Sequence, residues 1–65
     1  MKVIYDPLTD TLDMIFKEDR IVESDEDKPG IILDYAADGS IVSIEVLEAS
    51  KKMSQPIGIS FELAS

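Results

Sequence analysis

The chain has 65 residues, among them 6 basic and 14 acidic side chains that give a formal net charge of −8, and we predict a single domain over residues 1–65. It contains no cysteine and no histidine, so disulfides and thiolate metal sites are excluded and the commonest general base is missing. The acid excess disfavours nucleic acid and anionic membranes as partners and suits a basic protein, and the absence of a recognisable leader or long apolar run predicts a cytoplasmic location.

Two strands joined by a tight turn are predicted first. The segment KVIYD (2–6) is rich in β-formers and ends before Pro7, which restricts the preceding residue and favours a turn. The segment TLDMIF (11–16) alternates with period two and has one strongly apolar face. We expect the two strands to be antiparallel neighbours, and it stays open which of three consecutive apolar residues in the first strand join the core: Val3, Ile4 and Tyr5.

The next part of the chain is more polar. A weaker third strand is predicted at RIVES (20–24), after a charged turn. The stretch SDEDKPG (24–30) is the most polar in the sequence and ends in Pro-Gly, so it is predicted to be an exposed loop. Four acidic residues in this region are interpreted as a solvated charge run rather than an ion site: Glu23, Asp25, Glu26 and Asp27.

The segments on either side of Asp38-Gly39 predict a hairpin. A two-residue type I′ turn would place three apolar pairs on one face, Tyr35–Val42, Leu33–Ile44 and Ile31–Val46. The opposite face would then carry the pairs Asp34–Ser43 and Ile32–Glu45. A three-residue loop would instead place Leu33 opposite Ser43 and mix the faces, so the two-residue turn is preferred.

The same stretch, DYAADGSIVSIE (34–45), also has part of a calcium-loop pattern. Asp34, Asp38, Gly39 and Glu45 fall at the first, fifth, sixth and twelfth positions of an EF-hand loop. Its third and ninth positions, which usually supply oxygen ligands, are alanine and valine here, and the sequence that follows favours a strand over a helix. We therefore predict a hairpin and no calcium site.

A short helix and a further strand are predicted near the C-terminus. The segment LEASKKM (47–53) is rich in helix formers, but a helix near 48–53 is too short to be stable unless it docks on the rest of the chain. The segment PIGISFELA alternates without interruption, which predicts a strand near 57–63. Its apolar face consists of four residues: Ile57, Ile59, Phe61 and Leu63.

The sequence has no recognisable catalytic motif. Asp6, Asp10 and Asp13 flank the first turn, where aspartate commonly caps the backbone through its own side chain. The serines have no histidine to act as a base, and Lys51 and Lys52 are neighbours on a short helix, where lysines are usually solvated. We therefore predict a protein that is not an enzyme, with no catalytic, metal or cofactor-binding residues and no cofactor.

Two stretches resemble the family known as domain of unknown function 2283. The first, YDPLTDTL (5–12), has its Tyr-Asp and Asp-x-Leu elements. The second, ILDYAADGSIVSIEVLEASKKM (32–53), has its Asp-Tyr pair, Asp-Gly turn, Ile-Glu strand and Ala-Ser-Lys helix. Asp13 stands where the family often has an aromatic residue, and Ser43 where it usually has glycine. Both departures lie on predicted strands and bear on packing.

The resemblance implies a short acidic protein of bacteria or archaea with no established activity and no known catalytic residues. It also implies an antitoxin, because such proteins are often encoded beside small basic proteins that look like RNA-cleaving toxins. The predicted function is accordingly a non-catalytic protein-binding module, specifically the antitoxin of a basic toxin partner. The alternative is a homo-oligomeric structural or accessory protein with no toxin partner.

The predicted fold is mainly β, with α+β as the alternative: an antiparallel β-meander of about five strands, a short helix near 48–53 and a C-terminal strand near 57–63. A helix of this length, roughly 10 Å at about 1.5 Å per residue, is too short to cover an apolar face several strands wide. We therefore expect a homodimer in which a second copy covers that face, with the acidic residues 23–27 away from the contact.

Overall fold

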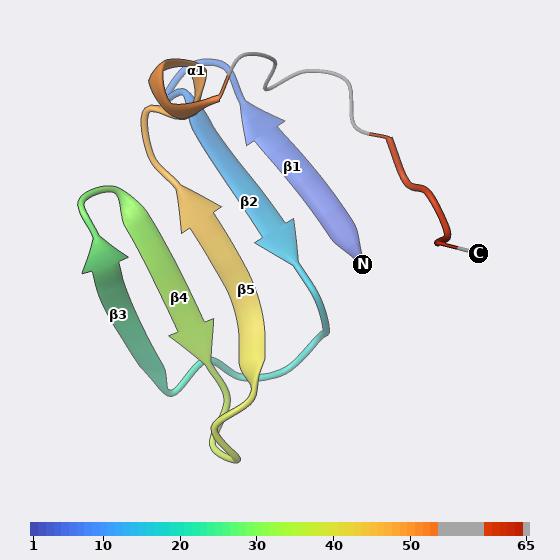
Figure 1. Ribbon diagram of the computed structural model, residues 1–65. Coiled ribbons are helices and arrows are strands. Elements are labelled where there is room, and N and C mark those ends of the chain that lie inside the picture. The colour runs from blue at the N-terminus through green and yellow to red at the C-terminus, as the bar shows by residue number, and fades with distance from the viewer. Residues whose placement is uncertain (54–59, 65) are drawn as a thin grey trace.

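The computed structural model describes residues 1–53 and 60–64, and in these residues five strands form one open antiparallel sheet with a short helix at one end (Figure 1). This confirms the mainly β fold class. The elements are β1 (Lys2–Asp6), β2 (Thr11–Ile15), β3 (Glu23–Lys28), β4 (Ile31–Tyr35), β5 (Ile41–Val46) and α1 (Ala49–Lys52).

The strands lie in the order β1-β2-β5-β4-β3. The predicted pairing of the first two strands is confirmed, with Lys2 opposite Ile15 and Asp6 opposite Thr11. Residues 16–22 then carry the chain past the lower ends of β5 and β4 to the far edge of the sheet, where β3 begins (Figure 1). The apolar strand β5 lies at the centre and the polar strand β3 at an edge, so each strand's position matches its composition.

The third strand does not lie where the sequence placed it. It runs over Glu23–Lys28, inside the stretch predicted to be an exposed loop, rather than over residues 20–24. All six of its side chains are exposed, so no apolar alternation marks it, and its pairing with β4 supplies the strand geometry. The turn that follows is held by the Gly30 N–H, which donates to Glu26 Oε2 at 2.8 Å.

The register of the β4–β5 hairpin is confirmed over most of its length. Leu33 lies opposite Ile44 and Ile31 opposite Val46, while Asp34 lies opposite Ser43 and Ile32 opposite Glu45. Apolar pairs therefore share one face of the sheet and polar residues gather on the other, as the alternation predicted.

The predicted type I′ turn was wrong, and so was the predicted pairing of Tyr35 with Val42. The Gly39 N–H donates to the Ala36 carbonyl at 3.0 Å, and the Ala36 N–H donates to the Ser40 carbonyl at 2.9 Å, which makes a three-residue loop. Gly39 has φ of 86°, and Asp38 is not among the residues with positive φ, although a type I′ turn requires both. Tyr35 consequently lies opposite Ile41, and a β-bulge restores the predicted register from Asp34 onward.

The hydrophobic core lies on one face of the sheet, which we call the apolar face. Leu12, Val46 and Ala49 form its buried centre, and Ala49 on α1 has 0% of its surface exposed. The helix caps only one end of this face (Figure 1). Partly buried residues pack around the centre: Val3, Tyr5, Met14, Ile31, Ile44 and Met53.

The C-terminal predictions have different outcomes. The short helix near 48–53 is confirmed as α1, after Glu48 in the left-handed region at φ 52°. Of the strand predicted near 57–63, residues 57–59 lie outside the described residues, and residues 60–63 do not form a strand. In the described part of the chain, no helix is long and apolar enough to cross a membrane.

Candidate functional site

Three carboxylates converge on the face opposite the core, which we call the polar face. Asp34 on β4 is only 2% exposed and accepts hydrogen bonds from Ser24 Oγ at 2.6 Å and Ser43 Oγ at 2.7 Å. It also shares a hydrogen bond with Glu45, two residues beyond Ser43 on β5. Asp13 on β2 lies directly opposite Glu45, so three neighbouring strands each place a carboxyl group in this cluster.

The surroundings of these groups move their pKa values in different directions. The hydrogen bond to Asp34, burial and the charges of Asp34 and Asp13 together raise the pKa of Glu45 to about 7. Burial by itself would raise the pKa of Asp34, but hydrogen bonds from Glu45, Ser24 and Ser43 outweigh it and hold that pKa below its usual value. Burial and the charge of Asp34 raise the pKa of Asp13. Glu45 therefore keeps its proton to a higher pH than a solvated glutamate does, and its O–H group donates a hydrogen bond to the ionised Asp34 carboxylate.

This cluster does not have the arrangement of a metal site. Over residues 1–53 and 60–64, no group of three acidic side chains is placed so that it could hold a metal ion. Of the calcium-loop residues, Asp34 and Glu45 hydrogen-bond to each other on the polar face, whereas Asp38 lies on the hairpin loop. There its carboxylate accepts from the Ser40 N–H at 3.0 Å. The Asp-Gly segment serves the hairpin turn.

The three aspartates around the first turn have separate structural roles. Asp6 accepts from the Leu8 N–H at 3.0 Å within the turn, and Asp13 faces the polar face. Asp10, at φ 54°, accepts from the Tyr5 hydroxyl at 2.7 Å and from the Ser50 hydroxyl at 2.6 Å, which fastens the start of α1 to the β1–β2 turn. The hydrogen bonds from Ser50 and Tyr5 lower the pKa of Asp10.

The two lysines of α1 interact with different partners. Lys51 forms an ion pair with Glu48 at 3.1 Å, and the Lys52 ammonium group donates to the Leu47 carbonyl. Both side chains lie at the surface, as predicted for solvated lysines.

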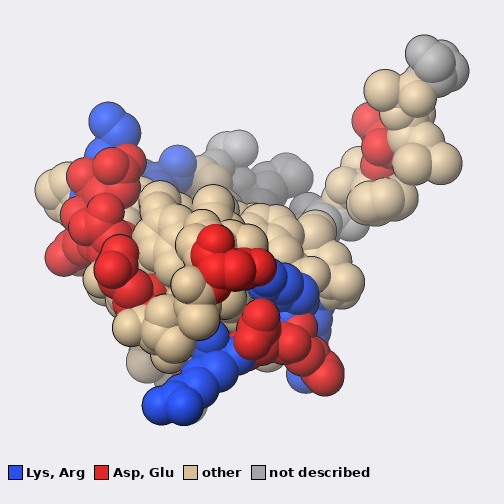
Figure 2. Space-filling model, turned by 90° about the horizontal axis from the view of Figure 1, so that it is seen from below, with Lys and Arg blue, Asp and Glu red and all other residues tan. Residues whose placement is uncertain are grey.

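Acidic side chains line the outer strand β3, and we call this edge of the sheet the acidic edge. Its acidic side chains are Glu23, Asp25, Glu26 and Asp27, and every residue of the strand is exposed. Seen from below, acidic side chains gather on the side of the molecule that carries β3 (Figure 2). Because β3 is the outermost strand, no further strand among residues 1–53 and 60–64 pairs with this edge.

Apolar side chains also remain at the surface. Ile4 on β1 is 43% exposed, and Phe61 and Leu63 near the C-terminus are 80% and 85% exposed. Isolated exposed apolar residues are ordinary, but the apolar face itself is covered by α1 at one end only. Self-association would bury such surface.

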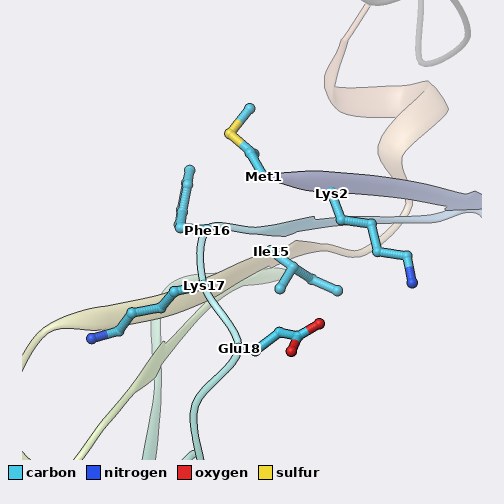
Figure 3. Close-up of a pocket in the computed structure, with 6 residues that line it drawn as sticks. All are labelled: Met1, Lys2, Ile15, Phe16, Lys17 and Glu18. Carbon is cyan, nitrogen blue, oxygen red and sulfur yellow. The ribbon is translucent and has the colours of Figure 1, made fainter.

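A shallow pocket lies where β1 begins and β2 ends (Figure 3). Lys2, Ile15 and Glu18 extend on one side of the strands, whereas Met1 and Phe16 extend on the other (Figure 3). The pocket is open to solvent, and its charged groups do not converge on one point in the close-up. It does not have the enclosed apolar form, with a few convergent polar groups, that small-molecule sites usually have.

The carboxyl cluster was not predicted from the sequence. Hairpin alternation placed Asp34 and Glu45 on one face, but the contribution of Asp13 depends on β2 lying beside β5. Asp13 and Ser43 are polar at positions where the family was expected to carry an aromatic residue and a glycine. These two departures were the available signal of the cluster in the sequence. Ser43 binds Asp34, and Asp13 faces Glu45.

Comparison with known proteins gives one family and no closer relative. Residues 2–50, well over half of the chain, match the model of a family described as protein of unknown function (DUF2283). No curated protein and no solved structure matches the chain.

Proposed function

The chain belongs to the DUF2283 family, and we propose that it is a non-catalytic protein-binding module that docks a basic protein through its acidic edge. The observation that carries this proposal is β3, an outer strand whose six side chains are all exposed and whose acidic residues form a row along the edge of the sheet. Such a surface attracts a basic partner and sets its orientation. A cytoplasmic location is part of the proposal.

The acidic edge suits a protein partner better than an ion. Its carboxylates are spread along a strand of six residues, and successive side chains point to opposite faces of the sheet. This spacing presents a row of negative charge to an extended surface, whereas a cation site needs several oxygens around one point. A basic helix or another extended basic surface matches the row in shape and charge.

The proposal is tested by a pull-down from the native host with a neutralised acidic edge. The variant Glu23→Gln/Asp25→Asn/Glu26→Gln/Asp27→Asn keeps the shape of each side chain and removes its charge. The control Glu18→Gln/Asp19→Asn/Glu48→Gln/Glu62→Gln neutralises the same number of exposed carboxylates elsewhere. We expect the wild type and the control to retain one basic partner at low salt, and the acidic-edge variant to lose it.

Two results would contradict this proposal. Equal retention by both variants would mean that the acidic edge is not the docking surface. Capture that is unaffected by high salt would mean that charge does not drive the contact, since screening weakens interactions between exposed charges.

In its most specific form the proposal makes this chain an antitoxin. The basic partner would then be a toxin of about domain size encoded in an adjacent reading frame, and binding would neutralise it. Co-expression with wild-type protein should relieve the growth arrest caused by that partner, and the acidic-edge variant should relieve it less.

The second part of the proposal is self-association as a homodimer. The apolar face is capped by α1 at one end, and a domain this small is only marginally stable by itself. A dimer without a basic partner would correspond to the alternative function, a structural or accessory homo-oligomer. Light scattering across micromolar concentrations distinguishes the dimer from a monomer.

A further inference from the structure

The two outer strands of the sheet differ in how well they could pair with another strand. Strand β3 carries a row of acidic side chains and a register shift between Glu26 and Lys28, and both features oppose the addition of a strand. Strand β1 pairs regularly with β2 over all five of its residues, without a shift. In the described residues no strand lies on its outer side (Figure 1).

The sequence of β1, KVIYD, is complementary to itself when it is read in the opposite direction. If two copies lie antiparallel with Ile4 opposite Ile4, then Lys2 of each copy lies opposite Asp6 of the other. Val3 then lies opposite Tyr5. Opposite charges and apolar side chains in directly opposed positions stabilise a strand pair, whereas like charges destabilise it.

Only this register, or one shifted by an even number of residues, places the apolar faces of the two sheets on the same side. Val3 and Tyr5 belong to the apolar face, whereas Lys2, Ile4 and Asp6 are exposed on the other face. A shift by one residue would place the apolar face of one copy beside the polar face of the other. A shift by two residues keeps the faces but shortens the pairing and removes both ion pairs.

Neither charged group that this pairing would use is engaged in an ion pair within the described part of the chain, although Asp6 accepts a hydrogen bond from the Leu8 N–H. The ion pairs there involve Lys17 and Lys51, and none includes Lys2 or Asp6. Ile4 lies between these two charges on the strand and is 43% exposed. Contact with a second copy would cover it.

We propose that two copies of this chain pair through β1, antiparallel and centred on Ile4, to form one continuous ten-stranded sheet. This inference rests on the proposed homodimer and assigns it an edge-to-edge contact, in place of the expected contact in which a second copy covers the apolar face. The two apolar faces become one surface across the junction, and both acidic edges lie at the far ends of the assembly, free for basic partners.

Charge reversal tests the pairing, with the oligomeric state measured by analytical ultracentrifugation. Asp6→Lys brings lysines opposite each other at both ends of the junction, and we expect it to weaken dimerisation roughly tenfold or more. The control Asp27→Lys changes the net charge by the same amount on β3, at the opposite edge of the sheet. General charge repulsion alone predicts that both variants dimerise more tightly than the wild type, so a weaker Asp6→Lys dimer is specific to β1.

Mixing provides a positive result that a folding defect cannot produce. Lys2→Asp and Asp6→Lys should each dimerise poorly alone. A mixture of the two should form a heterodimer, because opposite charges then face each other at both ends of the junction. The double variant Lys2→Asp/Asp6→Lys should regain the wild-type affinity. It carries the same loss of the Asp6 hydrogen bond to the turn as the single variant, so recovery isolates the contact between copies.

Cross-linking tests the register independently, because the natural chain has no cysteine. Residues directly opposite in antiparallel strands have Cβ atoms about 5 Å apart, close to the distance that a disulfide spans. Ile4→Cys should therefore form a disulfide dimer readily on mild oxidation. Leu8→Cys, in the exposed β1–β2 turn, should not.

The outcomes separate this inference from the proposed function. A dimer that is insensitive to Asp6→Lys and does not cross-link through Ile4→Cys would overturn pairing through β1 and leave a dimer through another surface. A monomer at every concentration would overturn both the pairing and the proposed dimer. Loss of the basic partner alone would overturn the docking proposal and leave the dimer intact.

Discussion

Glu45 is the side chain whose ionisation most directly affects this sheet. Its pKa is raised to about 7, chiefly by the hydrogen bond to Asp34, from an ordinary value of 4.5. Below pH 4.5 both the folded and the unfolded chain hold this proton, and its stabilisation is fully present. As the pH rises from 4.5 through 7, the unfolded chain releases the proton first, so this contribution to stability is lost.

The thermal midpoint Tm of the wild type should therefore fall between about pH 5 and pH 8. Because Glu45 is partly exposed, we expect a contribution on the order of 1 kcal/mol, or about 4–8 °C in a domain of this size. Glu45→Gln can still donate to Asp34 but does not titrate, so its Tm should fall less over this range. Circular dichroism melts at a series of pH values measure the difference.

The matched control for this prediction is Glu26→Gln. Glu26 also lies on the polar face, opposite Ile32, but it is exposed on β3. Glu26→Gln removes one carboxylate, as Glu45→Gln does, and so reduces the general repulsion between acidic groups. The slope of its Tm against pH should equal that of the wild type. Identical slopes for Glu45→Gln and the wild type would show that the Asp34–Glu45 pair does not hold the proton. Asp34 on β4, Lys2 and Asp6 on β1 and Asp13 on β2 also lie on this face, and Glu18 extends on the same side as Lys2 (Figure 3); all of them remain in the three proteins.

Single residues also show what could not be predicted from local sequence. Asp10 was interpreted as a turn cap, which needs only neighbouring backbone. In the structure its carboxylate accepts from the Ser50 N–H at 3.0 Å, forty positions along the chain. Such a contact depends on where α1 docks, and a sequence pattern within one turn has no information about it.

At the scale of elements, alternation predicted the strand pairing but not the loop that joins the strands. The apolar residues of β4 and β5 select a register in which Leu33 lies opposite Ile44, and the structure has that register. The three-residue loop was rejected because it would shift the pairing by one residue. The bulge at Val42 absorbs this shift, so loop length and final register are not tied together.

The three-residue loop requires a positive φ at Gly39, and a substitution there tests it. This residue has φ of 86°, and a Cβ atom placed there would meet nothing within 4 Å, so backbone strain is the only cost of a side chain. Gly39→Ala should lower the free energy of unfolding by about 1 kcal/mol, measured by urea denaturation. Gly39→Asn should cost less, because asparagine tolerates the left-handed region better. An alanine variant as stable as the wild type would contradict the three-residue loop.

Strand β3 could not be predicted from the alternation of apolar and polar residues. Its sequence ESDEDK has no apolar residue, because both of its faces are exposed, and nothing in the period-two pattern distinguishes it from a loop. Backbone pairing with β4 makes it a strand, and its charge keeps that outer edge from pairing further. The prediction of a polar, exposed segment was correct, and the prediction of its backbone conformation was wrong.

At the scale of the whole molecule, the strand order separates two kinds of edge. The acidic β3 and the self-complementary β1 lie on opposite sides of the sheet, with three strands between them. The proposed pairing through β1 would keep residues 23–27 away from the dimer contact, as the sequence analysis expected. The sequence alone could not place β3 at the edge opposite β1, because that position depends on the path of residues 16–22 across the sheet ends.

This separation predicts opposite responses of the two proposed contacts to salt. In a ten-stranded sheet with strands about 4.8 Å apart, the acidic edges lie roughly 40 Å from each other, while each Lys2–Asp6 pair spans about 5 Å. The screening length is about 30 Å at about 0.01 M ionic strength and about 8 Å at about 0.15 M, so salt added over this range suppresses the long-range repulsion between two −8 chains more than the short ion pairs. Raising the salt concentration should therefore increase the dimer fraction in analytical ultracentrifugation while it releases a basic partner from β3. A dimer that dissociates with rising salt would mean that attraction between charges, rather than apolar and backbone pairing along β1, holds the two copies together.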